Sequence, residues 1–384
     1  MRSNRAIRSI LLLALFAFIA LPFGSSAWCQ GEPEGPIHPR TGVQPQAMPK
    51  AEQERRALRS QVNEVIAPIT VRNASGEMVL DLTQKNFHVF DNGAEQKIDH
   101  FDLGGEPFSI VLAVETSSRI DALMPQVRKT GIIFTQTVMG QTSEAAVIGY
   151  DDSVLLLHGI TTDSDAIQSV INHLREGADG SRVYDAMAKG ISILEKRPAA
   201  RRRILVVMGE ARDTGSENKL GEVLRRAELA NVTIYSIGLS TTMAALRAKP
   251  SQAQPPEIGP PGTYPTPLPP GTLQTPDNES QVYGNMDLMG LAVWLLKTGK
   301  NAVGPNSLAV ASKATGGLHV NTMKDRSIEK AMDEIGGELH AQYSISYRPK
   351  GDNPSGYHEI KITVDRPNVT VRTRPGYYIA PPRS

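Results

Sequence analysis

A series of short, nearly continuous apolar runs in the middle of the chain constrains its fold most strongly. Runs this short and apolar are typical of strands that are buried on both faces of a sheet. Helical stretches separate several of them, for example at 121–138. Apolar strands that alternate with helices predict an α/β domain with a mostly parallel sheet, covered on both faces. The runs are 109–114, 145–149, 154–157, 204–208 and 232–237.

The expected α/β domain covers residues 106–341 and contains an insertion at 241–304. Residues 249–276 of the insertion are dense in proline and read as an extended excursion. Residues 286–296 are apolar enough for a short helix that docks on its own domain. The α/β pattern then resumes with a helix, the turn Thr315-Gly316-Gly317, a short strand and a helix over 327–339.

Both flanks of this domain have β-like patterns. Residues 57–105 predict a small β-rich unit, in which Asn92-Gly93 marks a hairpin whose type I′ turn needs positive φ at both central residues. The tail, 342–384, contains three strand-like runs that short loops join directly, so we expect these runs to pair antiparallel with one another. Because an isolated hairpin is marginally stable, the tail strands should pack with the N-terminal β-unit.

The N-terminus has the layout of a secretory signal peptide, which we expect to be cleaved near Ala27. Three arginines precede an apolar run at 10–23, and small residues follow at 24–27. An uncleaved anchor is the alternative, but the run is shorter than the ~20 apolar residues that a spanning helix needs. Residues 28–56 read as a flexible leader. The predicted location is therefore periplasmic or extracellular, with no membrane contact beyond the export signal.

Cysteine content and charge restrict the partners further. Cys29 is the only cysteine, so no intrachain disulfide can form. Lipid attachment there is an alternative, although Trp28 and Ser26 depart from the usual attachment pattern. Lys+Arg of 41 against Asp+Glu of 40 leaves a net charge of +1, which gives no field toward nucleic acid. The basic run 201–203 lies between a helix and a strand and reads as a solvated loop.

Three polar loops are candidate binding-site loops because ligands of open α/β sheets bind beyond the carboxyl ends of the strands. One follows the first strand, one precedes a helix, and one follows the fourth strand. Their sequences are Glu115-Thr116-Ser117-Ser118-Arg119, Gly180-Ser181-Arg182-Val183-Tyr184-Asp185-Ala186 and Gly209-Glu210-Ala211-Arg212-Asp213.

With further motifs, these loops resemble the von Willebrand factor type A family, and more closely its secreted bacterial VWFA-related branch, known mainly from acidobacteria. The likeness covers about residues 60–384. It implies a three-layer, Rossmann-like α/β domain with a β-rich accessory unit formed by both flanks. The other matching pieces are Phe87-His88-Val89-Phe90-Asp91-Asn92-Gly93, Val183-Tyr184-Asp185-Ala186, Ala314-Thr315-Gly316-Gly317, Gln342-Tyr343 and Val371-Arg372-Thr373-Arg374-Pro375-Gly376-Tyr377-Tyr378.

The family's metal ion-dependent adhesion site uses Asp-x-Ser-x-Ser after the first strand, a Thr in the second loop and an Asp after the fourth strand. The matching positions here are Glu115, Ser117, Arg119, Ser181 and Glu210, of which only Ser117 is unchanged. Mg²⁺ demands near-octahedral oxygen ligands, whereas Arg119 removes a hydroxyl and adds a permanent cation suited to carboxylates. We therefore expect no resident cofactor, and hypothesise that Arg119 replaces the metal by pairing with Glu115, Glu210 or both. Two alternatives are that Arg119 turns to solvent and that Mg²⁺ or another divalent cation still binds weakly.

An enzyme is the minority interpretation. The sequence contains no GxGxxG after a strand, no Walker-type loop, no HExxH, no paired CxxC and no GxSxG. A hydrolase using Ser117 and His158 would lack a nucleophile elbow. We expect a non-catalytic module of adhesion or scaffold type that binds another protein through the five mapped residues. The alternatives are a functional metal-dependent adhesion module and an inert structural envelope protein.

Overall fold

A six-stranded sheet forms the centre of the α/β part in the computed structural model, which describes residues 64–105, 107–239, 288–298, 306–322, 328–350 and 354–379. The predicted signal peptide, the leader, Cys29 and most of the insertion lie outside these residues. The sheet order is β10-β9-β8-β5-β6-β7. Its strands are β5 (Phe108–Glu115), β6 (Glu144–Tyr150), β7 (Val154–Thr161), β8 (Arg202–Gly209), β9 (Val232–Leu239) and β10 (His319–Thr322).

Neighbouring strands of this sheet run parallel, except that β6 and β7 are antiparallel. Counted within the domain, the spatial order is 3-2-1-4-5-6, which is the doubly wound order of Rossmann-like sheets. The predicted α/β class with a mostly parallel central sheet is confirmed at this level. The order reverses between β5 and β8, so the crevice where such folds bind ligands lies at the carboxyl ends of these two strands.

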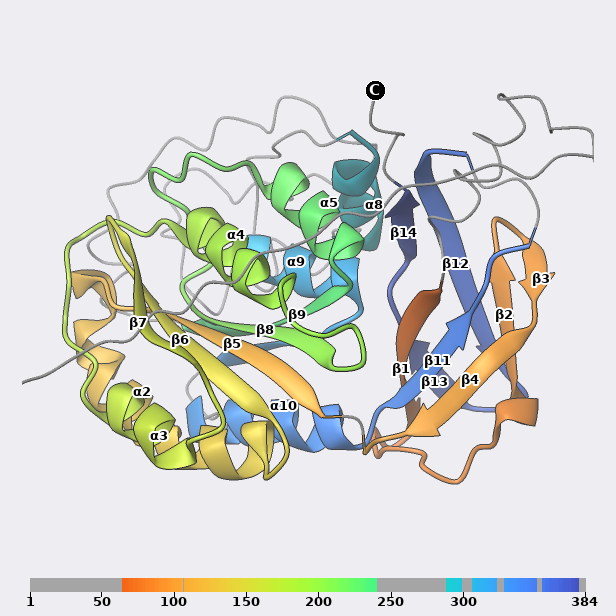
Figure 1. The fold of residues 1–384 in the computed structure, drawn as a ribbon, viewed down its shortest axis with the longest axis horizontal. Coiled ribbons are helices and arrows are strands. Elements are labelled where there is room, and N and C mark those ends of the chain that lie inside the picture. Colours follow the sequence, from red (N-terminus) through yellow and green to blue (C-terminus); the bar gives the residue numbers. More distant parts are fainter. Residues whose placement is uncertain are drawn as a thin grey trace, which may run out of the picture. The chain divides into compact units, whose positions relative to one another are not determined.

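Helices cover both faces of the sheet, as Figure 1 shows. Residues 110–114 of β5 are all apolar because Val111 and Ala113 face one helical layer and Ile110 and Leu112 face the other. The first layer contains α4 (Val183–Leu194), α5 (Leu220–Leu229), α8 (Leu288–Thr298) and α9 (Ser307–Thr315). The second contains α2 (Met124–Ile133), flanked by η2 (Ser118–Leu123) and η3 (Phe134–Met139), together with α3 (Ser164–Asn172) and α10 (Ile328–His340).

Helix α8 is the described part of the proline-rich insertion. Leu291 and Leu295 are buried against the same core as α4 and α5, so the helix docks on its own domain as predicted. The turn Thr315-Gly316-Gly317 is also confirmed, since Gly316 has φ of 80° and ends α9 in the left-handed region. Within the described residues no helix combines the length and the apolarity needed to cross a bilayer.

Two four-stranded sheets form the accessory β-part, in the orders β13-β1-β11-β4 and β14-β12-β2-β3. They share a core that includes Ile69, Val89, Tyr343 and Ile360. Each sheet takes strands from both ends of the described chain. The N-terminal strands are β1 (Val65–Asn73), β2 (Phe87–Asp91), β3 (Ala94–Gln96) and β4 (Ile98–Leu103), with the 3-10 turn η1 (Gln84–Asn86); the C-terminal ones are β11 (Tyr343–Tyr347), β12 (Gly356–Val364), β13 (Val369–Arg372) and β14 (Gly376–Ile379).

The predicted pairing of the tail strands with one another is wrong for β11, β12 and β13. Strand β11 pairs with β1 and β4, β12 pairs with β2 and β14, and β13 pairs with β1. Successive tail strands therefore alternate between the two sheets, because their apolar faces find N-terminal partners. The hairpin at Asn92-Gly93 is confirmed, with φ of 47° and 82°, between β2 and β3.

The expectation that 154–157 is a buried run is also wrong. Strand β7 lies at the edge of the six-stranded sheet and pairs only with β6 among the described strands. Leu155, Leu156 and Leu157 are 57%, 48% and 38% exposed. An apolar run reports strand propensity, but burial depends on the strand's place in the sheet.

The basic run 201–203 is not a solvated loop, which corrects a further expectation. Arg202 and Arg203 begin β8 and Arg201 directly precedes it; all three are half-buried, and their guanidinium groups contact nearby segments. Arg201 donates to the carbonyl of Phe108 at 2.9 Å, and Arg203 donates to that of Ala230 at 2.7 Å. Arg202 lies over the Phe108 ring, 5.0 Å from its centroid. These groups are engaged within the protein and do not form an exposed anion patch.

Candidate functional site

The candidate site lies where the strand order reverses, at the carboxyl ends of β5 and β8. Glu115 is the last residue of β5, and Glu210 directly follows β8. A third loop, 177–182, contacts the loops that follow both strands, since the Gly177 amide donates to the Thr116 carbonyl at 2.7 Å and the Thr214 amide donates to the Ser181 carbonyl at 2.7 Å. The three loops singled out in the sequence therefore meet at one edge of the sheet.

Both carboxylate oxygens of Glu115 already have donors. The side chain is fully buried. The Ser117 hydroxyl donates to Oε1 at 2.7 Å, and the Glu210 amide donates to Oε2 at 2.6 Å. Glu115 thus joins the first and fourth strand ends through its own side chain.

Burial raises the pKa of Glu115 to about 7. The hydrogen bonds from Ser117 and the Glu210 amide oppose this shift, as does the charge of Arg119, while the Glu210 carboxylate adds to it. A carboxyl with this pKa exchanges its proton near neutrality. Ser117 can accept from the protonated carboxyl instead of donating to it, so both forms keep a hydrogen bond.

Arg119 pairs with Glu210. It stands in η2, in the first turn after the Ser117 N-cap, and its Nη2 donates to Oε2 of Glu210. The two side chains are only 20% and 12% exposed. Arg119 therefore does not turn to solvent, and of the two glutamates it is Glu210 that it contacts directly.

Ser181 lies in the same loop cluster but bonds to a different residue. Its amide donates to the Thr214 hydroxyl at 2.7 Å, and the Thr214 amide donates to its carbonyl at 2.7 Å. Its own hydroxyl is buried and has no hydrogen-bond partner among the described residues. The structure thus brings Glu115, Ser117, Arg119 and Glu210 into one bonded set and leaves the Ser181 hydroxyl outside it.

The residues that hold the second loop in place were not among the five mapped positions. The Asp151 carboxylate accepts from the Ala178 amide at 3.1 Å, and the Ser118 amide donates to the Ala178 carbonyl at 3.0 Å. Ser118 also donates to the Asp179 carboxylate. The available signal was the Asp-Asp-Ser turn after the second apolar run, together with the glycines at 177 and 180.

Gly209 is required by the close approach of the strand end to Glu115. A Cβ there would lie 2.1 Å from the Tyr150 hydroxyl and 2.6 Å from Oε2 of Glu115. We expect Gly209→Ala to lower the free energy of unfolding by about 1–3 kcal/mol, because both neighbours are buried and must shift. Urea unfolding measures this. Gly159→Ala is the matched control, since a Cβ at that strand glycine meets nothing within 4 Å; equal stability of the two variants would contradict the close approach.

The family resemblance implies a divalent cation at this site. Such ions take six or more oxygen ligands. Here both oxygens of Glu115 accept protein hydrogen bonds, and a guanidinium bonds to Glu210. The described residues contain no cluster of three or more His, Cys, Asp or Glu arranged to hold a metal. As these side chains lie, they do not fit a hard cation.

The hydrolase interpretation with Ser117 and His158 receives no support from the contacts. Ser117 donates to Glu115, while His158 lies on the edge strand β7 with its Nδ1 at 2.7 Å from the Gly159 carbonyl. No contact joins Ser117 and His158 in the described part of the chain.

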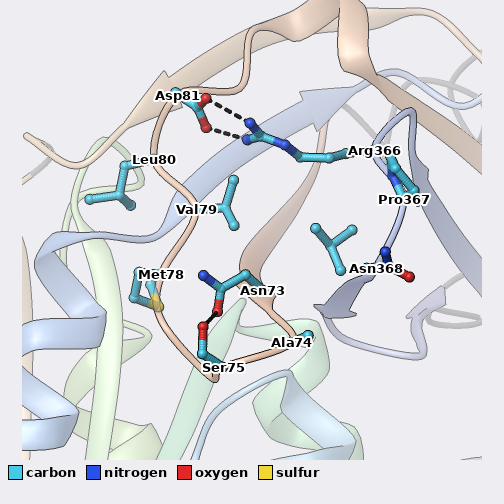
Figure 2. Close-up of a pocket in the computed structure, with 11 residues that line it drawn as sticks. Asn73, Ala74, Ser75, Met78, Val79, Leu80, Asp81, Arg366, Pro367 and Asn368 are labelled. Carbon is cyan, nitrogen blue, oxygen red and sulfur yellow. Dashed lines mark hydrogen bonds and ion pairs between the residues drawn. The ribbon is translucent and has the colours of Figure 1, made fainter.

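A pocket of about 770 Å³ lies in the accessory β-part between residues 73–81 and 366–369, where Arg366 pairs with Asp81 (Figure 2). None of the five mapped residues lines it.

Comparison with known proteins gives distant structural likenesses. No model of a known protein family matches the chain, and no curated protein matches it. BatB, a conserved hypothetical protein from Bacteroides thetaiotaomicron, is 12% identical over 60% of this chain and 98% of its own, with a TM-score of 0.37. An aerotolerance-related membrane protein from Bacteroides fragilis has the same identity and coverage and a TM-score of 0.36. The SpRpn10 VWA domain is 16% identical over 36% of this chain and 79% of its own, with a TM-score of 0.30. With TM-scores below 0.5, these likenesses carry no argument about function.

Proposed function

We propose that this chain is an exported, non-catalytic protein-binding module of the von Willebrand factor A type, whose adhesion site is held together without a metal ion. The observation that carries this is the Arg119–Glu210 ion pair beside the buried Glu115, at the point where the strand order reverses. The doubly wound strand order and the motifs quoted above support the family assignment. The partner is another protein, bound at the rim formed by the three loops.

In this proposal Arg119 does the electrostatic work of the cation. A guanidinium presents several N–H donors in a fixed plane and stays charged at every physiological pH. It neutralises Glu210, while Ser117 and the Glu210 amide satisfy Glu115. The loops are thereby connected by side-chain hydrogen bonds instead of a shared ion, so partner binding should not depend on divalent metal.

One observation favours the runner-up, a metal-dependent adhesion module. The buried Ser181 hydroxyl lacks a partner among the described residues, and it occupies the position of a family ligand. A divalent cation, which is coordinated by oxygen atoms, would give this hydroxyl a partner. An inert structural protein is the third candidate; it would bind its partner equally well after substitution of Glu115 and Glu210.

Metal titration separates the metal-free module from the metal-dependent one. A ligand that binds only the folded state raises the midpoint of thermal unfolding. We expect the wild-type midpoint to be the same in EDTA, Mg²⁺, Mn²⁺ and Ca²⁺. We expect Arg119→Ser, which restores a hydroxyl and removes the cation, to gain several degrees at saturating Mg²⁺ or Mn²⁺.

Arg128→Ser is the matched control for this substitution. Arg128 contacts Glu176 and the Leu174 carbonyl, away from the five mapped residues, so its loss should create no metal response. A metal-induced rise in the wild-type protein would revive the metal-dependent module. An Arg119→Ser variant that gains no metal response would count against replacement of a metal by Arg119.

A further inference from the structure

Strand β7 offers an unusual free edge. Of the edge strands in the described residues, it is the longest that carries no charged residue. Strand β4 contains Asp99 and Asp102, β13 contains Arg372, and β3 has only three residues, one of them Glu95. Strands β10 and β14 have four residues each. Charges and short length are the usual protection of a sheet edge against pairing, and β7 has neither.

The exposed leucines of β7 present apolar surface on both faces of the sheet edge. Leu156 pairs in register with Ile148, which belongs to the core under α4. Leu155 pairs with Gly149, and the side chain of Leu157 also lies beside Gly149. A strand added along this edge would cover all three leucines and satisfy the outward backbone groups.

The register between β7 and β6 shows which part of the β7 edge is regular enough to pair with another strand. It is regular over Val154–Leu156 and shifts beyond Leu156, where β7 has extra residues relative to β6. The centre of the regular stretch is Leu155, which is also the most exposed of the leucines at 57%. An antiparallel pair about a two-fold axis at Leu155 would use this stretch from both partners.

We propose that two copies of this chain pair through β7 in this way, which would join their six-stranded sheets into one. A two-fold axis at Leu155 sets Val154 opposite Leu156 of the partner subunit, so apolar side chains meet apolar side chains on each face. The occupant is a second copy because the two-fold axis sets this uncharged, apolar stretch against an identical stretch, so each exposed side chain of Val154–Leu156 meets an apolar partner.

Sedimentation over a concentration series tests the dimer. We expect wild-type protein to dimerise, and Leu155→Lys to raise the dimer dissociation constant tenfold or more, because a lysine would face its symmetry mate. Ile132→Lys is the matched control, since Ile132 is 47% exposed on α2, and it should dimerise like wild type. Wild-type protein that stays monomeric at 100 µM (roughly a hundred times a micromolar affinity), or a dimer that survives Leu155→Lys, would overturn the proposal.

Cysteine cross-linking tests the register in a Cys29→Ser background. Opposed residues of antiparallel strands have Cα atoms about 4.5–5.5 Å apart, within the reach of a disulfide. Leu155→Cys should therefore form an intermolecular disulfide under mild oxidation with copper phenanthroline, which accepts the two electrons. Leu157→Cys should not, because the two Leu157 positions would be roughly 13 Å apart along the strands. Equal cross-linking of both variants would overturn this pairing.

Discussion

Replacing Arg374 with methionine is expected to lower the free energy of unfolding by about 3–5 kcal/mol, because the change leaves a buried carboxylate without its partner. Arg374 is 4% exposed and bonds to Glu228, which is 3% exposed. The same guanidinium donates to the Ile66 carbonyl at 3.1 Å and to the Gly376 carbonyl at 2.9 Å. One side chain thus connects the tail, strand β1 and helix α5, and all these acceptors lose a donor in the variant.

The defect of Arg374→Met should depend on pH. Burial raises the pKa of Glu228 to about 7, and Arg374 opposes that shift. Without Arg374 the carboxyl takes up a proton more readily, so the loss of stability should be smaller at pH 5 than at pH 8. A second change, Glu228→Gln, should recover part of the loss at pH 8. Urea unfolding at both pH values measures these effects.

Arg366→Met is the matched control, because Arg366 forms a two-point ion pair with Asp81 on the exposed surface. Exposed ion pairs contribute little to stability, so this variant should unfold close to wild type. Arg374→Met that is as stable as Arg366→Met would contradict the structural role of the buried pair.

The sequence predicted those features that local pattern determines. Strand β5 was expected because 109–114 is apolar at every position but its first, and the structure shows why: helices cover both faces of β5. Glycine and asparagine marked the turns at Asn92-Gly93 and Gly316, where φ is positive. In each case the physical requirement falls on one residue or one short segment.

Features that depend on distant partners could not be predicted in this way. The run 154–157 looks like a central strand, yet its burial depends on the sheet order, which places β7 at an edge. Arg374 belongs to a motif that was noticed, but its partner Glu228 is 146 residues away. The tail strands likewise pair with strands from the other end of the chain, which a local sequence pattern does not indicate.

The sequence predicted which residues form the candidate site, but not which of them contact one another. Motif resemblance put Glu115, Arg119 and Glu210 together, but left open which glutamate Arg119 would contact. That choice depends on geometry: the Ser117 hydroxyl and the Glu210 amide already occupy both oxygens of Glu115, so the guanidinium bonds to Glu210. The separate bonding of Ser181 to Thr214 had no sequence signal.

Glu115→Gln should remove a pH dependence of stability that wild-type protein shows between about pH 4.5 and pH 7. Burial raises the pKa of the folded-state carboxyl from its ordinary value of 4.5 to about 7. The folded state therefore binds more protons than the unfolded chain in this window, and stability falls as pH rises through it. At about 1.4 kcal/mol per pKa unit, the shift lowers the free energy of unfolding by about 3 kcal/mol by pH 8.

Glutamine imitates the protonated carboxyl, since its amide can donate to Ser117 while its carbonyl accepts from the Glu210 amide. The variant should therefore be more stable than wild type at pH 8 and about equal to it at pH 4.5. Urea unfolding across pH 4.5–8 measures both curves, and because Glu228 contributes a similar slope to each, their difference reports Glu115. The exposed Glu176→Gln serves as control and should keep the wild-type slope. If Glu115→Gln keeps that slope as well, Glu115 is ionised throughout the range, and two full carboxylates share a single guanidinium at this site.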